Sequence, residues 1–134
     1  MSVETTEAER MREIDERTEL YVRLFNKGDA DALDELYTDE GVVVWGEDGT
    51  AVGGADRKPY VREFLASGPT MTKAEVKHAY VTADTALLVV EWAMDAPGAD
   101  GSVEHLTGKA LDVLRRGDDG LWRYAIDHPY GDER

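Results

Sequence analysis

The chain contains no cysteine, few histidines and little positive charge. Its 134 residues include 3 His, and 15 Lys and Arg stand against 29 Asp and Glu, for a formal net charge of −14. Without cysteine there is no disulfide, thiolate zinc site, iron–sulfur cluster or cysteine nucleophile. The acidic balance argues against nucleic acid and anionic membranes as partners, because both require basic patches.

The sequence also lacks long hydrophobic runs. No apolar stretch approaches the length of about 18 residues that a membrane-spanning helix needs, and the first twenty residues carry no apolar signal-peptide core. We therefore expect a cytoplasmic protein without a membrane partner. The length suits one domain over residues 1–134, of which 1–5 are expected to be a disordered N-terminus.

Several catalytic motifs are missing as well. There is no G-x-G-x-x-G, no Walker A sequence and no G-x-S-x-G nucleophile elbow. His78, His105 and His128 show no short metal-ligand spacing, although residues from three strands could converge on a metal. We predict neither a metal nor a cofactor. Acid–base chemistry by Tyr, Asp, Glu and His remains, or no chemistry at all.

Three helices are predicted in the first half of the chain. Thr6 and Glu9 have the spacing of a capping box, and apolar residues then recur at steps of three and four as far as Phe25. Asp29 is placed to cap a short second helix that carries Ala32, Leu33, Leu36 and Tyr37. A third helix is predicted over residues 56–67, where Gly and Pro follow it.

The second half of the chain predicts strands. A β-branched run over residues 42–46 is followed, from residue 75 onward, by four segments separated by turn sequences. This order predicts an α+β fold, with three N-terminal helices packed on a mainly antiparallel sheet. Such a sheet should curve around the long helix into a cone whose interior forms a pocket for a small apolar ligand.

Side-chain alternation selects residues that point into this pocket. Asp112 shares its predicted strand face with small and apolar residues, an unusual setting for a carboxylate. In the last strand, Asp127 shares a face with Ala125, whereas Trp122 should lie on the opposite face and serve packing or an interface. Tyr21 lies on the apolar face of the first helix. One phenol and two carboxylates can therefore face inward.

Two segments carry a family resemblance. Residues 21–49, YVRLFNKGDADALDELYTDEGVVVWGEDG, and residues 108–131, GKALDVLRRGDDGLWRYAIDHPYG, resemble the nuclear transport factor 2-like superfamily. That superfamily includes ketosteroid isomerase and the SnoaL-like polyketide cyclases, and the closing segment looks most like the ketosteroid isomerase homolog group. The resemblance implies a cone-shaped α+β barrel with a deep pocket, and a homodimer packed through the sheet.

The resemblance also implies roles for individual residues. It places Tyr21 on the oxyanion-hole tyrosine of the isomerases and Asp112 on their oxyanion-hole aspartate, which is also the position of the cyclase aspartate. A neutral Asp beside a Tyr stabilises an enolate in ketosteroid isomerase, a worked case of this chemistry. The position of the isomerase base falls on Trp45, whose indole cannot take a carbon-bound proton. A replacement base would have to come from Asp127, His105 or Glu91.

Each candidate also has a purely structural interpretation. Tyr21 can be a core residue, Asp112 can lie on a solvated or dimer-facing surface, and Asp127 can cap the turn before Pro129. We nevertheless predict a catalytic group and a ligand-binding group. The catalytic group comprises Tyr21, Asp112 and Asp127; the ligand-binding group comprises Trp45, Tyr60, Trp92 and His105.

Two functions follow from these candidates. The first is a cofactor-independent acid–base catalyst of the isomerase, cyclase or dehydratase type, acting on a small apolar carbonyl or enol compound. The second is a non-catalytic module of the same fold that binds a hydrophobic ligand or mediates dimerisation. A base within hydrogen-bond reach of the pocket centre would separate the two.

Overall fold

The computed structural model describes residues 6–44 and 50–131. Two predictions, the disordered segment 1–5 and the ligand-binding Trp45, lie outside these residues. The elements follow in the order α1 (Glu7–Lys27), α2 (Ala30–Asp34), β1 (Tyr37–Val43), β2 (Val52–Gly53), a 3-10 turn η1 (Gly54–Asp56), α3 (Arg57–Ala66), β3 (Thr70–Val81), β4 (Thr85–Pro97), β5 (Val103–Arg116) and β6 (Trp122–His128).

The ends of α1 follow the capping signals in the sequence. The Thr6 side chain accepts a hydrogen bond from the Glu9 backbone N–H at 3.1 Å, and Gly28 ends the helix in the left-handed region at φ 73°. Asp29 then caps α2 by accepting from the Ala32 N–H. The predicted third helix is confirmed as α3, within one residue at either end.

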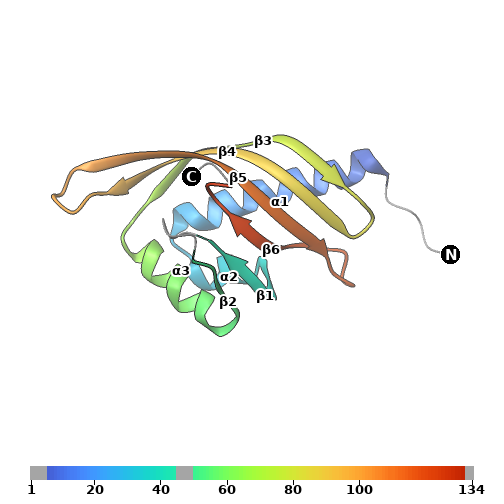
Figure 1. Cartoon of the computed structure of the whole chain (residues 1–134), viewed down its shortest axis with the longest axis horizontal. Helices are drawn as coiled ribbons and strands as arrows, with labels where there is room; N and C mark the ends of the chain where they lie inside the picture. Colours follow the sequence, from blue (N-terminus) through green and yellow to red (C-terminus); the bar gives the residue numbers. More distant parts are fainter. Residues whose placement is uncertain (1–5, 45–49, 132–134) are drawn as a thin grey trace.

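The six strands form one open sheet in the order β2-β1-β6-β5-β4-β3. All neighbouring pairs are antiparallel except β1 and β6, which are parallel. Figure 1 shows the long strands β3, β4 and β5 beside one another, with α2 and α3 gathered near β1 and β2. The predicted α+β class with a mainly antiparallel sheet is confirmed. Among the described residues, no helix has the length and apolar character needed to span a membrane.

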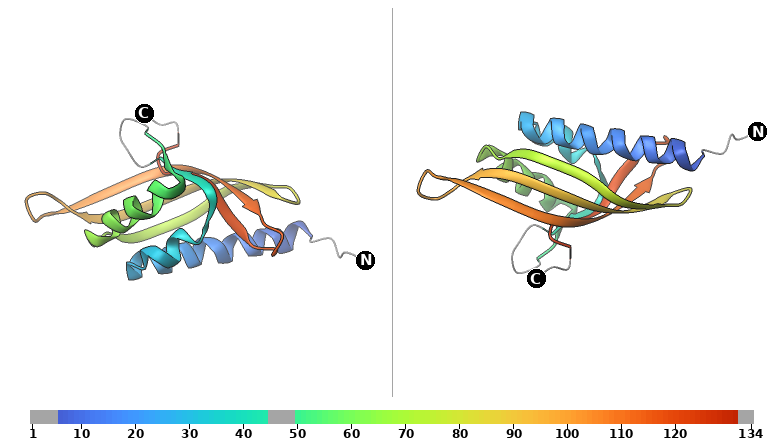
Figure 2. Two further views of the ribbon diagram at one scale, coloured as in Figure 1. Left: turned by 90° about the horizontal axis from the view of Figure 1, so that it is seen from below. Right: turned by 90° about the horizontal axis from the view of Figure 1, so that it is seen from above.

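Helix α1 lies along one face of the curved sheet (Figure 2). Its apolar stripe buries Ile14, Tyr21 and Phe25, and the inward residues of β4, among them Leu88 and Met94, are buried as well. The side chains of a strand alternate between its faces, so the remaining side chains lie on the other face of the sheet, which α1 does not cover. The layer between α1 and the sheet forms the core and holds the site described below.

Strand β6 contains a bulge that reverses its alternation. Val113 of β5 is opposite Ile126, but the next residue, Leu114, is opposite Tyr124, so Ala125 is an extra residue in β6. As a result, Trp122, Tyr124 and Asp127 are all buried. The prediction that Trp122 faces away from Asp127 is therefore wrong, because it assumed strict alternation along the strand.

Candidate functional site

A narrow cavity of about 50 Å³ lies between α1 and the inner face of the sheet. Its polar residues are Thr18, Tyr21, Asp112, Tyr124 and Asp127, and its other lining residues are Val22, Met71, Ala74, Val90, Trp92, Ala110 and Pro129. On the order of three water molecules would fill this volume. The cavity is thus apolar along most of its wall, with a small group of phenols, carboxyls and one hydroxyl.

The two carboxyls of this group lie side by side. Asp112 of β5 and Asp127 of β6 are directly opposite in the strand register, with 7% and 5% of their surface exposed. Burial and the neighbouring Asp127 charge raise the pKa of Asp112 well above its ordinary value. Burial also raises the pKa of Asp127, but hydrogen bonds from Tyr37, Asp112 and Tyr21 oppose that increase. The pKa of Asp112 is therefore raised further than that of Asp127, so Asp112 is the more basic member of the pair.

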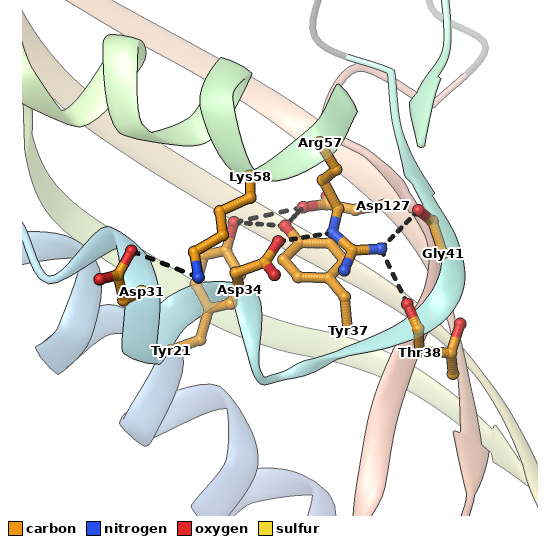
Figure 3. Close-up of polar contacts among 9 residues, drawn as sticks. All are labelled: Tyr21, Asp31, Asp34, Tyr37, Thr38, Gly41, Arg57, Lys58 and Asp127. Atoms are coloured by element: carbon orange, nitrogen blue, oxygen red, sulfur yellow. Dashed lines mark hydrogen bonds and ion pairs between the residues drawn. The ribbon is translucent and has the colours of Figure 1, made fainter. Parts of the chain in front are cut away.

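Two tyrosine hydroxyls hold Asp127. Tyr37 donates to Asp127 Oδ2 at 2.6 Å, and Tyr21 donates to the same oxygen at 3.2 Å. The two hydroxyl oxygens are 3.2 Å apart, and Figure 3 shows both directed at this carboxylate. Burial, reinforced by the Asp127 charge, raises the pKa of both tyrosines well above 10, which keeps them as donors. The Tyr21 hydroxyl is thus directed at Asp127, whereas the predicted oxyanion role requires it to face a substrate oxygen.

A buried arginine packs over the ring of Tyr37. The Arg57 guanidinium lies 4.8 Å from the centre of the Tyr37 ring, and only 4% of Arg57 is exposed. It donates to Asp34 at 2.8 Å and to the backbone carbonyls of Thr38 and Gly41 at 2.8 and 2.7 Å (Figure 3). The residues after α2 and the start of α3 are thereby joined at one point, which sets the position of the Tyr37 ring.

Trp92 forms a wall of the cavity because Gly108 leaves room for its ring. A Cβ atom on Gly108 would come within 2.6 Å of the Trp92 ring, so the indole lies directly against the neighbouring strand. Its Nε1 donates to the Pro129 carbonyl at 2.5 Å. This bond ties the indole of β4 to the turn that follows β6.

The structure brings most of the predicted residues together. Tyr21, Asp112, Asp127 and Trp92 all line the cavity. Tyr60 does not: it is half-buried on α3, packed against the hydrophobic core. Two further predicted residues lie elsewhere, and they are described next.

His105 and Glu91 are not near the carboxyl pair. His105 is exposed near the start of β5, where its Nδ1 contacts Asp95 at 2.5 Å. Glu91 pairs with Lys73 at 3.3 Å. Neither residue lines the cavity, so the structure leaves Asp127 as the only one of the three replacement bases at this site. Within residues 6–44 and 50–131, no three His, Asp or Glu side chains are grouped to hold a metal ion.

Sequence reasoning missed two residues of this site, Tyr37 and Arg57. The sequence places Tyr37 at the end of the short second helix, whereas in the structure α2 ends at Asp34 and Tyr37 is the first residue of β1. Arg57 is a charged residue at the start of a helix, a position that is usually exposed. No local pattern in the sequence marks Tyr37 as a site residue, because its place depends on the pairing of β1 with β6.

Comparison with known proteins identifies the family. Residues 18–125 match the family model of the SnoaL-like domain, and the chain belongs to this family. The nuclear transport factor 2-like superfamily predicted from the sequence is thereby confirmed. No match was found among curated proteins.

Solved structures share the fold. A ketosteroid isomerase-like protein from Erwinia carotovora atroseptica is 26% identical, with 90% of this chain and 94% of that chain covered and a TM-score of 0.72. A candidate dehydratase of the NTF2-like family from Streptomyces avermitilis is 18% identical, with 92% and 96% covered and a TM-score of 0.76. A candidate scytalone dehydratase from Novosphingobium aromaticivorans is 15% identical, with 89% and 81% covered and a TM-score of 0.73. The cavity and its residues thus lie in a fold shared with proteins described as ketosteroid isomerase-like and as candidate dehydratases.

Proposed function

We propose that this protein is a cofactor-independent acid–base catalyst of the isomerase, cyclase or dehydratase type, acting on a small apolar carbonyl or enol compound. The observation that carries the proposal is the Asp112–Asp127 pair, buried side by side on an otherwise apolar cavity. Two carboxyls whose surroundings separate their pKa values supply an acid and a base at the same pH.

The pair can move a proton between the oxygen and a carbon of the substrate. In the ketonisation direction, the enol O–H bond breaks as a proton passes to Asp112, and the proton that Asp112 already carries passes to Asp127. Asp127 then gives its proton to the substrate carbon, where a C–H bond forms as the carbonyl is restored. The reverse sequence enolises a ketone. Tyr37 and Tyr21 hold Asp127 in place throughout by their hydrogen bonds.

Two facts support this assignment of roles. Asp127 takes the part that the isomerase base would have at Trp45, because it lines the cavity and lies directly opposite Asp112 in the strand register. The structural neighbours described as ketosteroid isomerase-like and as dehydratases also favour proton-transfer chemistry for this chain. The alternative, a hydrophobic-ligand-binding module, would leave the pair without a catalytic task.

Hydrogen–deuterium exchange at carbon tests the proposal. A small ketone such as acetone is incubated with the protein in D2O, and NMR follows loss of the protons next to the carbonyl. We expect faster exchange with the wild type, and a loss of about a hundredfold or more in Asp127→Asn and Asp112→Asn. Asp95→Asn, at a carboxylate outside the cavity, is the matched control. Exchange that is absent in the wild type, or equal in all variants, would favour the binding module.

We also propose a homodimer formed through the outer face of the sheet. Apolar residues of five neighbouring strands stand in one register row across this face: Tyr80, Leu87, Val113, Ile126 and Val42. Tyr80, Leu87 and Ile126 are exposed in the single chain. A contiguous apolar row of this kind is typical of a protein–protein contact.

A further inference from the structure

A groove outside the cavity runs between α1 and β3, two elements that pack against each other (Figure 2). Its volume is about 260 Å³, against about 50 Å³ for the cavity. The two spaces share four lining residues: Thr18 and Val22 of α1, and Met71 and Ala74 of β3. Three of these four are only half-buried, so the boundary between the two spaces reaches the surface and the groove continues the cavity outward.

A bulge in β3 shapes this boundary. Met71 and Lys73 are opposite consecutive residues of β4, so Thr72 is an extra residue in β3. Met71 and Ala74 therefore both line the cavity although they are three positions apart. Thr72 and Lys73, between them, are exposed and line the groove. The same short segment of β3 thus forms the edge of the cavity and the floor of the groove.

An asparagine fixes one end of the opening. The Asn26 side chain accepts a hydrogen bond from the Met71 N–H at 2.7 Å through Oδ1, and its Nδ2 donates to the Met71 carbonyl at 3.0 Å. The side-chain amide thus pairs with Met71 as a neighbouring strand would. This pairing ties the end of α1 to the start of β3, so the separation of helix and strand is set where the opening begins.

The groove favours an uncharged chain. Three of the four shared residues are apolar, and they form a continuous wall from the cavity into the groove. The charged residues of the described lining are Glu19 and Lys73, and Lys73 already forms an ion pair with Glu91 at 3.3 Å. A charged chain of either sign would therefore meet a like charge in the groove, whereas a hydrocarbon chain would cover the apolar wall.

We infer that the protein takes unbranched aliphatic methyl ketones, with the acetyl group in the cavity and the hydrocarbon chain in the groove between α1 and β3. The choice of a carbonyl head rests on the proposed function, whereas the place of the chain rests on the shared lining alone. A cavity of about 50 Å³ holds on the order of three atoms of water size, which matches the three heavy atoms of an acetyl group. A ketone with its carbonyl in mid-chain has no end this small beside the carbonyl.

Two isomeric ketones test the inference. 2-Octanone and 4-octanone share one formula and nearly the same hydrophobicity, but only 2-octanone ends in an acetyl group. Two-dimensional NMR titration of the labelled protein gives the dissociation constant of each. We expect 2-octanone to bind about tenfold more tightly than 4-octanone, and the methyl resonances of Val22 and Met71 to shift.

Chain length gives a second measurement on the wild type. Across 2-butanone, 2-hexanone and 2-octanone, the affinity should rise about twofold for each added CH2. Complete burial of a CH2 would give a larger gain, but a groove that is open to solvent on one side covers only part of each.

One variant assigns the gain from chain length to the boundary. Ala74→Leu fills the passage between cavity and groove, so its affinities for 2-butanone and 2-octanone should agree within about twofold. Ala79→Leu is the matched control, because Ala79 is also half-buried on β3 but lines neither space; it should keep the wild-type gain. If Ala74→Leu does not fold, the two octanones and the chain-length series on the wild type still decide the matter.

Several results would overturn the inference. These are equal binding of the two octanones, an affinity that does not rise with chain length, a gain that survives in folded Ala74→Leu or disappears in Ala79→Leu, or no resonance shift with any ketone. Its failure can be told apart from failure of the proposed function, because binding is read without turnover. A preference for 2-octanone without carbon exchange leaves the inference in place and removes the catalyst. Exchange of acetone without any dependence of affinity on chain length does the opposite.

Discussion

The Tyr37 hydroxyl donates to Asp127 Oδ2 at 2.6 Å, the shortest of the bonds that hold this carboxylate. The two residues are 90 positions apart in the chain, and the parallel pairing of β1 with β6 brings them together. A charged acceptor makes this hydrogen bond stronger than a neutral pair would. Tyr37 is therefore a positioning residue for Asp127, one that does not itself line the cavity.

Replacing Tyr37 by phenylalanine tests this role. We expect Tyr37→Phe to lower the free energy of unfolding by about 2 kcal/mol, measured by urea denaturation, because the bond to a buried charge is lost. The pKa of Asp127, followed by carboxyl NMR, should rise further. Tyr21→Phe removes the longer bond to the same oxygen and should have a smaller effect on both quantities. Equal effects of Tyr37→Phe and Tyr21→Phe would contradict the expectation that Tyr37 makes the stronger hydrogen bond to Asp127.

The raised pKa of Asp112 predicts how stability changes with pH. The folded protein holds a proton on Asp112 that the unfolded chain releases above its ordinary pKa of about 4. The stabilisation from this protonated carboxyl is therefore fully present below pH 4, and it is lost as pH rises from there through the folded pKa. The Asp112→Asn variant stays neutral, so its stability relative to the wild type should increase with pH over that window. If the urea midpoints of the wild type and Asp112→Asn change with pH in parallel, the raised pKa of Asp112 is refuted.

Gly108 should not tolerate a side chain. In Gly108→Ala, the new Cβ would meet three ring atoms of Trp92 at 2.6–2.8 Å, which forces the indole away from the strand and from the Pro129 carbonyl. We expect a loss of about 2 kcal/mol in unfolding free energy, together with a change in tryptophan fluorescence. Thr107→Ala, at the exposed preceding position, is the control and should leave both quantities nearly unchanged. A stable Gly108→Ala with native fluorescence would show that the new Cβ is accommodated without displacing the Trp92 indole.

Arg57 should be among the most sensitive charged residues of the described chain. Arg57→Met leaves Asp34 and two backbone carbonyls without their donor, and removal of one partner from a buried pair costs about 3 to 5 kcal/mol. Thermal and urea unfolding measure this loss. Arg62→Met, which breaks an exposed pair with Asp31, is the matched control and should have little effect. Similar stabilities of Arg57→Met and Arg62→Met would argue against a stabilising role for the hydrogen bonds of Arg57.

The proposed dimer predicts a mass in solution. Analytical ultracentrifugation should give about twice the chain mass of 14.9 kDa, because the apolar row on the outer sheet would be buried between two copies. Leu87→Glu places a charge within this row, between Tyr80 and Val113, and should yield monomers that stay folded by circular dichroism. Val103→Glu, at an exposed apolar residue outside the row, should remain dimeric. A monomeric wild type at high micromolar concentration would defeat the proposal.

Local signals in the sequence were sufficient for the helix caps and for Tyr21 and Asp112 of the site, whereas β1 begins at Tyr37 and β3 at Thr70, earlier than the predicted strands at 42 and 75. The Thr6 and Asp29 caps and the helical repeat through Phe25 act within a few residues of one another, so they can be read without the fold. The inward direction of Asp112 follows from strict alternation, and β5 keeps that alternation over the residues around it. Tyr21 was likewise placed by the apolar stripe of a regular helix.

The tertiary structure decided the rest, because the rest depends on pairing between distant segments. The extra residue at Ala125 is visible only in the register of β6 against β5, and it is what buries Trp122 on the same side as Asp127. The bond between Tyr37 and Asp127 and the packing of Arg57 on Tyr37 have no local signature. Periodicity within one segment determines which way its side chains face, whereas the identity of their partners is set only when the strands and helices pack.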